Sequence, residues 1–429
     1  MTTAHLIAHG VGGRQDLPVP LSEALTGAVM ALVATFVLVA GTRSPPCRPT
    51  GRTLPARIQR AVDARLTRRA LGLAGVLAAA WFTAAVLAGD PDPARNAAPG
   101  MLYVLLWVGV PLASLVCGPV WRRLNPLRFL YGLVTPRPRR PYPEAWGYRP
   151  AALLLASFAW LELVAPNRTS PAVVGAYAGA YAVVAFGGAV VFGPRWFARA
   201  DAFEVYSTLV ARMSPLGRGP DGRLVLRSPL AGLAALPVRP GLRAMVLVLL
   251  GSTAYDGLSG APFWIRLRQD GPLPDAVTGT LGLAAAITVV SAGYALAAAA
   301  ADRIARHRPG TARQFAPAVL PVALGYVVAH YVTLLLTEGQ RTVILASDPF
   351  GTGADLLGLA DRAVDDAVLT PATTSHVQIV SVIAGHVVGT IATHDTADRT
   401  FTAGRVASQL PMLSLMVLYT VTGLGLLLA

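Results

Sequence analysis

Three ionisable side chains that could perform chemistry lie inside apolar stretches of this 429-residue chain. They are Asp256, His330 and His386, and each belongs to a different stretch. Ionisable groups are costly in an apolar interior and usually face a partner, a cavity or a bound ion. Two imidazoles and a carboxylate are also ligands for a divalent metal such as zinc, whose bound water can become a hydroxide nucleophile. The residue types therefore predict a shared site, with metal-assisted hydrolysis as one chemistry.

Other interpretations of these residues stay open. The sequence contains no HExxH and no CxxC motif, so any ligand set has to come from tertiary packing. Each histidine taken singly can be a hydrogen-bonding group between helices. A proton or cation path through a transporter can use Asp256, Glu338 and the same histidines. A bis-histidine haem is disfavoured because the two histidines differ in depth by roughly one turn and lack a companion pair.

The composition is that of a membrane protein. Hydrophobic residues make up 54% and charged residues 14% of the chain, and the mean hydropathy is +0.54. Soluble domains contain about 25% charged residues. The net charge of +14 comes from arginines in loops, where anionic lipid headgroups are the natural counterpart. We therefore expect a lipid bilayer as partner and no nucleic acid.

Ten apolar stretches are each about long enough for a helix to cross the hydrocarbon core. The sequence thus predicts an all-α, polytopic transmembrane helix bundle that forms a single integral membrane domain over 1–429. The fourth stretch is short and carries Glu162. The expected spans are 21–41, 70–89, 101–119, 150–166, 171–194, 243–260, 276–300, 315–337, 376–394 and 409–429.

The arginines predict the topology. All 36 basic residues are arginine, and 29 of them lie in alternate loops, at 42–69, 121–149, 195–243, 302–314 and 395–408. Positively charged loops stay on the cytoplasmic side, so these loops are expected inside and both termini outside. The segment 1–20 is then extracytoplasmic, 338–375 is an outside loop, and the protein belongs to the cytoplasmic membrane of a bacterial cell.

Amphipathic segments are also expected in the membrane interface. Residues 54–69 and 201–213 are predicted to be helices that lie in this interface. Glu162 and Glu204 are expected there as well.

The depths of the ionisable groups favour one site in the outer half of the bilayer. At 1.5 Å per residue, His330 lies about 10 Å and His386 about 15 Å below the outer surface, and Asp256 lies near the outer third. Further candidate metal ligands at the mouth above them are His9, Glu338 and His376.

Several short motifs carry a family resemblance over nearly the whole chain. They are HGVGGRQDLPVP at 9–20, GSTAYDGL at 251–258, GH at 385–386, THD at 393–395 and QLPM at 409–412. With these motifs the chain resembles a family of multi-pass bacterial membrane proteins labelled fenitrothion hydrolase. The resemblance implies hydrolysis of an organophosphate triester. The positions here to which we assign that activity are His9, Asp256, His330 and His386.

The sequence-based hypothesis is a membrane-embedded, metal-dependent phosphoric triester hydrolase. Asp256, His330 and His386 would hold a divalent metal such as zinc, whose hydroxide attacks phosphorus in line. An apolar small-molecule substrate would enter from the lipid. The alternatives are an ion-coupled or metal-ion transporter of the cytoplasmic membrane, and a noncatalytic membrane assembly protein.

Overall fold

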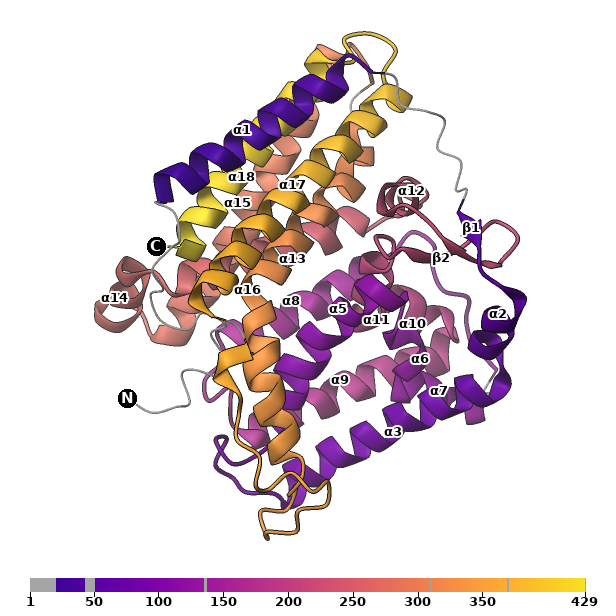
Figure 1. The fold of residues 1–429 in the computed structure, drawn as a ribbon, viewed down its shortest axis with the longest axis vertical. Coiled ribbons are helices and arrows are strands. Elements are labelled where there is room, and N and C mark those ends of the chain that lie inside the picture. The colour runs from indigo at the N-terminus through magenta and orange to yellow at the C-terminus, as the bar shows by residue number, and fades with distance from the viewer. Residues whose placement is uncertain (1–20, 43–50, 135–136, 309, 369, 429) are drawn as a thin grey trace. The chain divides into compact units, whose positions relative to one another are not determined.

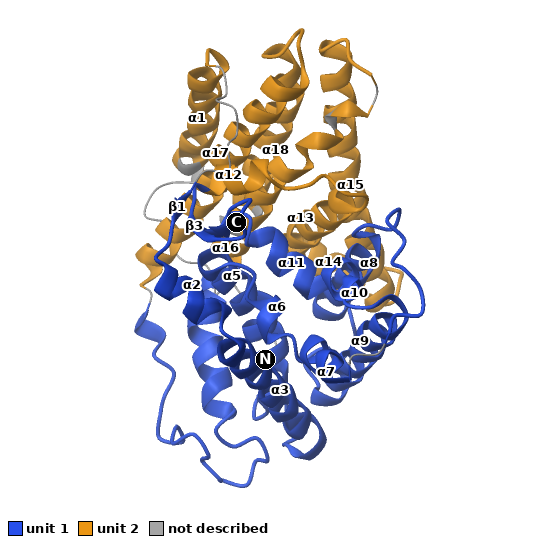
Figure 2. Ribbon diagram, turned by 90° about the vertical axis from the view of Figure 1, so that its right-hand side faces the viewer, with its two compact units in different colours: residues 1–11, 50–228, 331–368 blue, residues 12–49, 229–330, 369–429 orange. Residues whose placement is uncertain are grey.

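The protein is mostly helical, as Figure 1 shows, which confirms the all-α part of the predicted fold class. The computed structural model describes residues 21–42, 51–134, 137–308, 310–368 and 370–428. These residues form two compact units, coloured separately in Figure 2. Unit 1 contains the described residues of 51–228 and 331–368, and unit 2 contains those of 21–42, 229–330 and 370–428.

Unit 1 is built from short and long helices with one small sheet. Its three strands pair antiparallel in the order β1-β3-β2. Val225 of the central strand β3 lies opposite Thr53 of β1 on one side and Gly217 of β2 on the other. Its elements are β1 Arg52–Thr53, α2 Ala56–Asp63, α3 Arg65–Ala88, α4 Ala98–Gly100, the π-helix η2 Met101–Gly109, α5 Val110–Cys117, α6 Trp121–Leu124, α7 Pro126–Val134, α8 Arg149–Leu163, α9 Pro171–Phe192, α10 Arg195–Ala200, α11 Ala202–Val210, β2 Leu216–Arg218, β3 Leu224–Leu226 and the 3-10 helix η4 Asp366–Val368.

Unit 2 consists of helices alone within the described residues. Helix α16 runs through the boundary at His330, so only its first half belongs to this unit. The elements are α1 Leu21–Ala40, α12 Pro229–Ala234, α13 Leu242–Ser259, α14 Pro262–Asp270, α15 Asp275–Ile304, the 3-10 helix η3 Thr311–Phe315, α16 Ala316–Leu345, α17 Pro371–Thr400, the 3-10 helix η5 Ala407–Gln409 and α18 Leu410–Leu428.

Each of the ten predicted spans coincides largely with helix, and in the described part of the chain seven helical segments are long and apolar enough to cross a membrane. An eighth span is formed if α13 and α14, which meet at a bend of 82°, count as one. Helix α8 has 15 residues, and the apolar part of α1 is Leu25–Ala40, so both fall short of that length. The seven segments are Arg65–Ala88, Ala98–Cys117, Pro171–Phe192, Asp275–Ile304, Arg313–Leu345, Pro371–Thr400 and Ala407–Gly425.

Glycines let the helices of unit 2 approach closely around the candidate site. A Cβ atom on Gly385 of α17 would lie 2.5 Å from the carbonyl oxygen of Pro321 and 3.0 Å from Cα of Gly325, both on α16. On α13, a Cβ on Gly251 would lie 2.6 Å from Cα of Ile287 of α15. Small residues at such crossings allow backbones to pack against each other without a side chain between them. The crossing places α17, which carries His386 after Gly385, against α16.

The structure corrects the interface prediction for 201–213. Helix α11 is buried inside unit 1, where it packs against α5, α6, α8 and α10. Glu204 is buried and accepts two hydrogen bonds of 2.7 Å from Arg128, while burial raises the pKa of its carboxyl group. Glu162, also expected at the interface, is buried on α8. The prediction failed because an apolar helix face can pack on protein as well as on lipid, and periodicity does not distinguish the two.

The glycine crossing makes a stability prediction. Gly385→Ala is expected to destabilise the protein by about 1–3 kcal/mol, because the added methyl group must push α16 and α17 apart. Gly187→Ala on α9 is the matched control, since a Cβ there meets nothing within 4 Å. The measurement is thermal unfolding of both detergent-purified variants. Equal midpoints for Gly385→Ala and the control would contradict the packing argument.

Candidate functional site

Asp256 and His330 form a buried pair between two helices of unit 2. Oδ2 of Asp256, on α13, lies 2.8 Å from Nε2 of His330, on α16. Their side chains are 2% and 4% exposed, so neither group has bulk water to solvate it. The pair offsets the high cost of placing each ionisable group alone in an apolar interior. The structure therefore brings together two of the three residues that the sequence analysis placed at the centre of the site.

The ring of Tyr326 stacks on His330. Both residues lie on α16, four positions apart, with ring centroids 5.7 Å apart and planes inclined by 16°. Helical spacing of four places the two side chains on one face. Tyr326 is buried, and its hydroxyl group has no hydrogen-bond partner among the described residues.

His386 presents a basic nitrogen with a defined orientation. Its Nδ1 lies 2.8 Å from the carbonyl oxygen of Val382, one turn earlier on α17. A carbonyl oxygen only accepts hydrogen bonds, so Nδ1 must carry the proton and Nε2 of the neutral ring carries the lone pair. This residue is 3% exposed, and Nε2 has no partner in the described part of the chain.

His386 and Tyr326 line the same large cavity. The cavity has a volume of about 780 Å³ and is enclosed by α13, α14, α15, α16, α17 and α18 of unit 2. Its lining is almost wholly apolar, and His386 is the one imidazole in it; no Asp, Glu or Arg among the described residues lines it. Small-molecule sites are typically apolar cavities with a few polar groups that fix orientation. The cavity has the size and lining for an apolar small molecule.

The cavity runs from an exposed apolar rim to a buried polar floor. Val289 on α15 is 69% exposed and Leu418 on α18 is 58% exposed, whereas Tyr326 and His386 are buried. Helix α14 contributes Phe263 to the rim. Because α15 and α18 are apolar enough to span a membrane, their exposed rim residues would face lipid.

The described residues do not fit the metal centre predicted from the sequence. No three His, Cys, Asp or Glu side chains among them come together in a group that could hold a metal ion. Asp256 and His330 form a pair, and His386 is bound through Nδ1 to its own helix. The donor set that a zinc ion needs, at least three protein ligands, is not gathered by these residues.

The remaining candidate ligands are not placed at this cavity. His9 lies outside the described residues. Glu338 is in the unit 1 part of α16, where its carboxylate lies 3.1 Å from Arg341. His376, on the first turns of α17, is exposed, and its Nδ1 lies 2.6 Å from the carbonyl oxygen of Ala372.

Sequence reasoning missed Tyr326 as a site residue. Its spacing of four residues from His330 in one helix was the signal that could have identified it. The aromatic wall formed by Trp264 and Tyr419 was also missed, because nothing in the sequence indicates that α14 and α18 face one cavity. The hydroxyl group of Tyr419 donates to the carbonyl oxygen of Val290 at 2.9 Å.

The buried pair predicts a strong dependence on Asp256. Asp256→Asn is expected to destabilise the protein by roughly 3–5 kcal/mol, because it removes one member of a buried pair and leaves the other. Asp256→Asn combined with His330→Gln should cost less than the sum of the single changes, since the residues are coupled. Chemical unfolding of the purified protein measures both, with Asp270→Asn at an exposed position as control. Additive losses would show that the two groups do not interact.

Comparison with known proteins assigns no role to these side chains. No family model, curated protein or solved structure matches the chain. The chemistry of the cavity therefore has to be inferred from His386, Tyr326 and the buried pair of Asp256 and His330.

Proposed function

We propose that the protein is a membrane-embedded hydrolase of apolar esters, of the organophosphate triester class that the family resemblance implies. The observation that carries the proposal is the pair of unpartnered polar atoms, Nε2 of His386 and the hydroxyl oxygen of Tyr326, in residues that line an apolar cavity of about 780 Å³. Buried polar atoms normally have partners, so unpartnered ones in residues that line a cavity support a ligand beside them.

The proposed reaction uses His386 as a general base. A water molecule beside Nε2 gives its proton to that nitrogen while its oxygen attacks phosphorus, and the bond from phosphorus to the leaving aryl or alkyl oxygen breaks. The proton then passes to the leaving oxygen, which yields a phosphodiester and a phenol or alcohol. The hydrogen bond from Nδ1 to Val382 holds the ring in the tautomer that this step needs. No metal ligand is required for it.

Tyr326 is proposed to bind the phosphoryl group. Its hydroxyl can donate a hydrogen bond to the phosphoryl oxygen or sulfur, where negative charge grows in the transition state. The stacked ring of His330, fixed by Asp256, restricts the position of Tyr326. Asp256 and His330 thus act as positioning residues in this account and do not contact the substrate.

The apolar rim supports entry of the substrate from lipid. A triester without charge partitions into hydrocarbon, and the exposed side chains of Val289 and Leu418 offer it an apolar path to the buried floor. The product diester is an anion, which an apolar cavity with no cation in its described lining disfavours. This asymmetry favours release of product after each turnover.

The proposed setting is the cytoplasmic membrane of a bacterium, with ten spans and both termini outside. The seven long apolar helices, the bent pair α13 and α14, and the shorter α1 and α8 supply ten segments at the predicted positions. The alternation of arginine-rich and arginine-poor loops supports their orientation.

The topology can be tested by cysteine labelling in whole cells. In a background of Cys47→Ser and Cys117→Ser, Thr352→Cys is expected to react with an impermeant maleimide in intact cells. Arg137→Cys is expected to react only after the membrane is opened, because its loop is placed inside. Labelling of Arg137→Cys in intact cells would overturn the orientation.

A transporter is the second candidate, and the Asp256 to His330 pair favours it. Ionisable pairs inside spans are typical of proton relays in pumps and transporters. In that function activity requires a sealed bilayer, whereas hydrolysis proceeds in detergent. Proton-coupled uptake into reconstituted vesicles, with no triester cleavage in detergent, would replace the hydrolase proposal by this one.

The hydrolase proposal predicts a strong dependence of triester cleavage on His386. Detergent-purified protein is expected to release the phenol of an aryl dialkyl phosphorothioate, and His386→Ala should lower that rate by about 10²–10⁴-fold, the usual contribution of a general base. Tyr326→Phe should cause a smaller loss. His307→Ala, at an exposed histidine of the same unit, is the matched control.

Two outcomes of the same assay would contradict this account. Unchanged cleavage by His386→Ala would remove His386 from the reaction. Loss of activity with EDTA, restored by zinc, would replace the base route with the metal-dependent hydrolase predicted from the sequence.

A further inference from the structure

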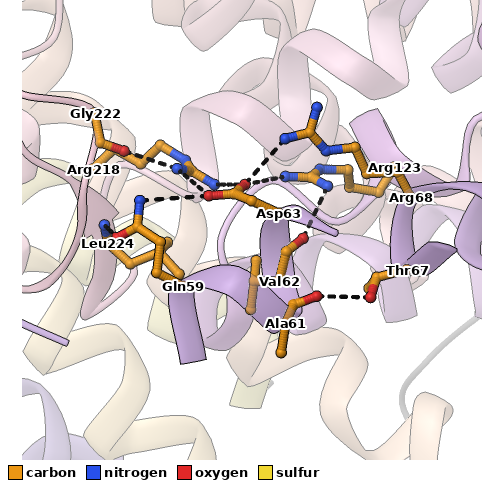
Figure 3. A network of polar contacts seen from close by, with 10 residues as sticks. All are labelled: Gln59, Ala61, Val62, Asp63, Thr67, Arg68, Arg123, Arg218, Gly222 and Leu224. Atoms are coloured by element: carbon orange, nitrogen blue, oxygen red, sulfur yellow. Dashed lines mark hydrogen bonds and ion pairs between the residues drawn. The ribbon is translucent and has the colours of Figure 1, made fainter. Parts of the chain in front are cut away.

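Three arginines of unit 1 meet at a single carboxylate, as Figure 3 shows. Arg218 binds Asp63 through two nitrogens, at 2.5 and 3.1 Å. Arg68 and Arg123 lie farther from the same carboxylate, at 3.4 and 3.6 Å. Three guanidinium groups and one carboxylate leave two positive charges in excess.

One carboxylate does not satisfy these guanidinium groups. Arg218 uses its donors on Asp63 and on the carbonyl oxygen of Gly222, at 2.8 Å. Its hydrogen bond to Asp63 holds the pKa of that carboxyl below the usual value, while burial and the neighbouring arginines lower the pKa of Arg123. The side chains of Arg68 and Arg123 are 55% and 29% exposed, so a second anion could reach them.

The cluster lies at the ends of two apolar helical segments. Arg68 is in the first turn of α3, which is one candidate span. Arg123 is on α6, a few residues after the candidate span that ends at Cys117. Helices α3 and α6 pack against each other within unit 1. The charged groups are therefore placed where headgroup phosphates meet the ends of transmembrane helices.

Exposed apolar side chains beside the cluster identify the kind of anion. Ile58 and Val62 on α2 and Leu66 on α3 are exposed, although all three are aliphatic. An amphipathic helix with arginines and exposed apolar residues is typical of a segment that lies in the membrane interface. A soluble phosphate would leave these side chains in water, whereas a phospholipid covers them with its acyl chains.

We propose that Arg68 and Arg123, beside Asp63, bind the phosphate group of an anionic phospholipid whose acyl chains cover the exposed aliphatic residues of α2 and the start of α3. Guanidinium groups suit this ligand because their planar arrays of donors match phosphate oxygens. The bound lipid anchors α2 and the β1-β3-β2 sheet to the membrane surface.

The test is native mass spectrometry of the full-length protein in detergent, with phosphatidylglycerol, phosphatidylcholine or glycerol 3-phosphate added. Phosphatidylglycerol is expected to be retained preferentially, and less so as salt is raised. Arg68→Gln combined with Arg123→Gln should reduce its retention by roughly tenfold or more. Arg139→Gln, an exposed arginine outside the cluster, is the control.

A second variant distinguishes loss of lipid binding from loss of folding in the Arg68→Gln and Arg123→Gln double variant. Asp63→Asn removes the carboxylate that competes for the arginines and is expected to increase phosphatidylglycerol retention several-fold, which a purely structural role for Asp63 would not produce. Equal retention of phosphatidylglycerol and phosphatidylcholine would overturn the proposal. Equal binding of glycerol 3-phosphate would overturn the assignment to a lipid.

Discussion

The cost of leaving a polar group without a partner in a waterless interior governs the organisation of unit 2. Asp256 and His330 meet at 2.8 Å because neither has bulk water to solvate it. His386 satisfies one ring nitrogen on its own helix and leaves the other facing no protein partner among the described residues. His386 also lines the cavity, and we therefore propose that an external molecule binds beside this nitrogen.

Glycines at the helix crossings of unit 2 allow the polar side chains to gather around the cavity. Close contact between Gly385 and the α16 backbone holds α17 against α16, and His386 of α17 and Tyr326 of α16 line one cavity. Helices α14, α15 and α18 complete the lining of the cavity, to which α15 contributes the small residues Gly282, Ala285 and Ala286. The helix crossings hold the helices that carry His386 and Tyr326 in fixed positions beside the apolar part of the cavity. A general base needs such a fixed position to hold a water molecule in line with a bound ester.

The sequence predicted the parts of the fold that depend on local pattern. The length of the apolar stretches predicted the helices. The rise per residue of a helix predicted similar depths for Asp256 and His330 in the bilayer. The sequence did not show that His386 faces a cavity with Tyr326, nor that Glu204 is paired with Arg128 in a buried helix. Periodicity identifies the apolar face of a helix, whereas the neighbour of that face is set by tertiary crossings such as the one at Gly385. Tertiary packing also decides whether three metal ligands meet, and among the described residues they do not.

In the proposed function, a neutral triester occupies the cavity with its phosphoryl group at His386. The most direct measurement is a cryo-electron microscopy structure of the full-length protein in lipid with a triester analogue that cannot be hydrolysed. Density for the analogue is expected in the cavity, with phosphorus next to Nε2 of His386 and its oxygen at the hydroxyl of Tyr326. Density for the analogue elsewhere, or a lipid chain held in the cavity with His386 turned away, would contradict it.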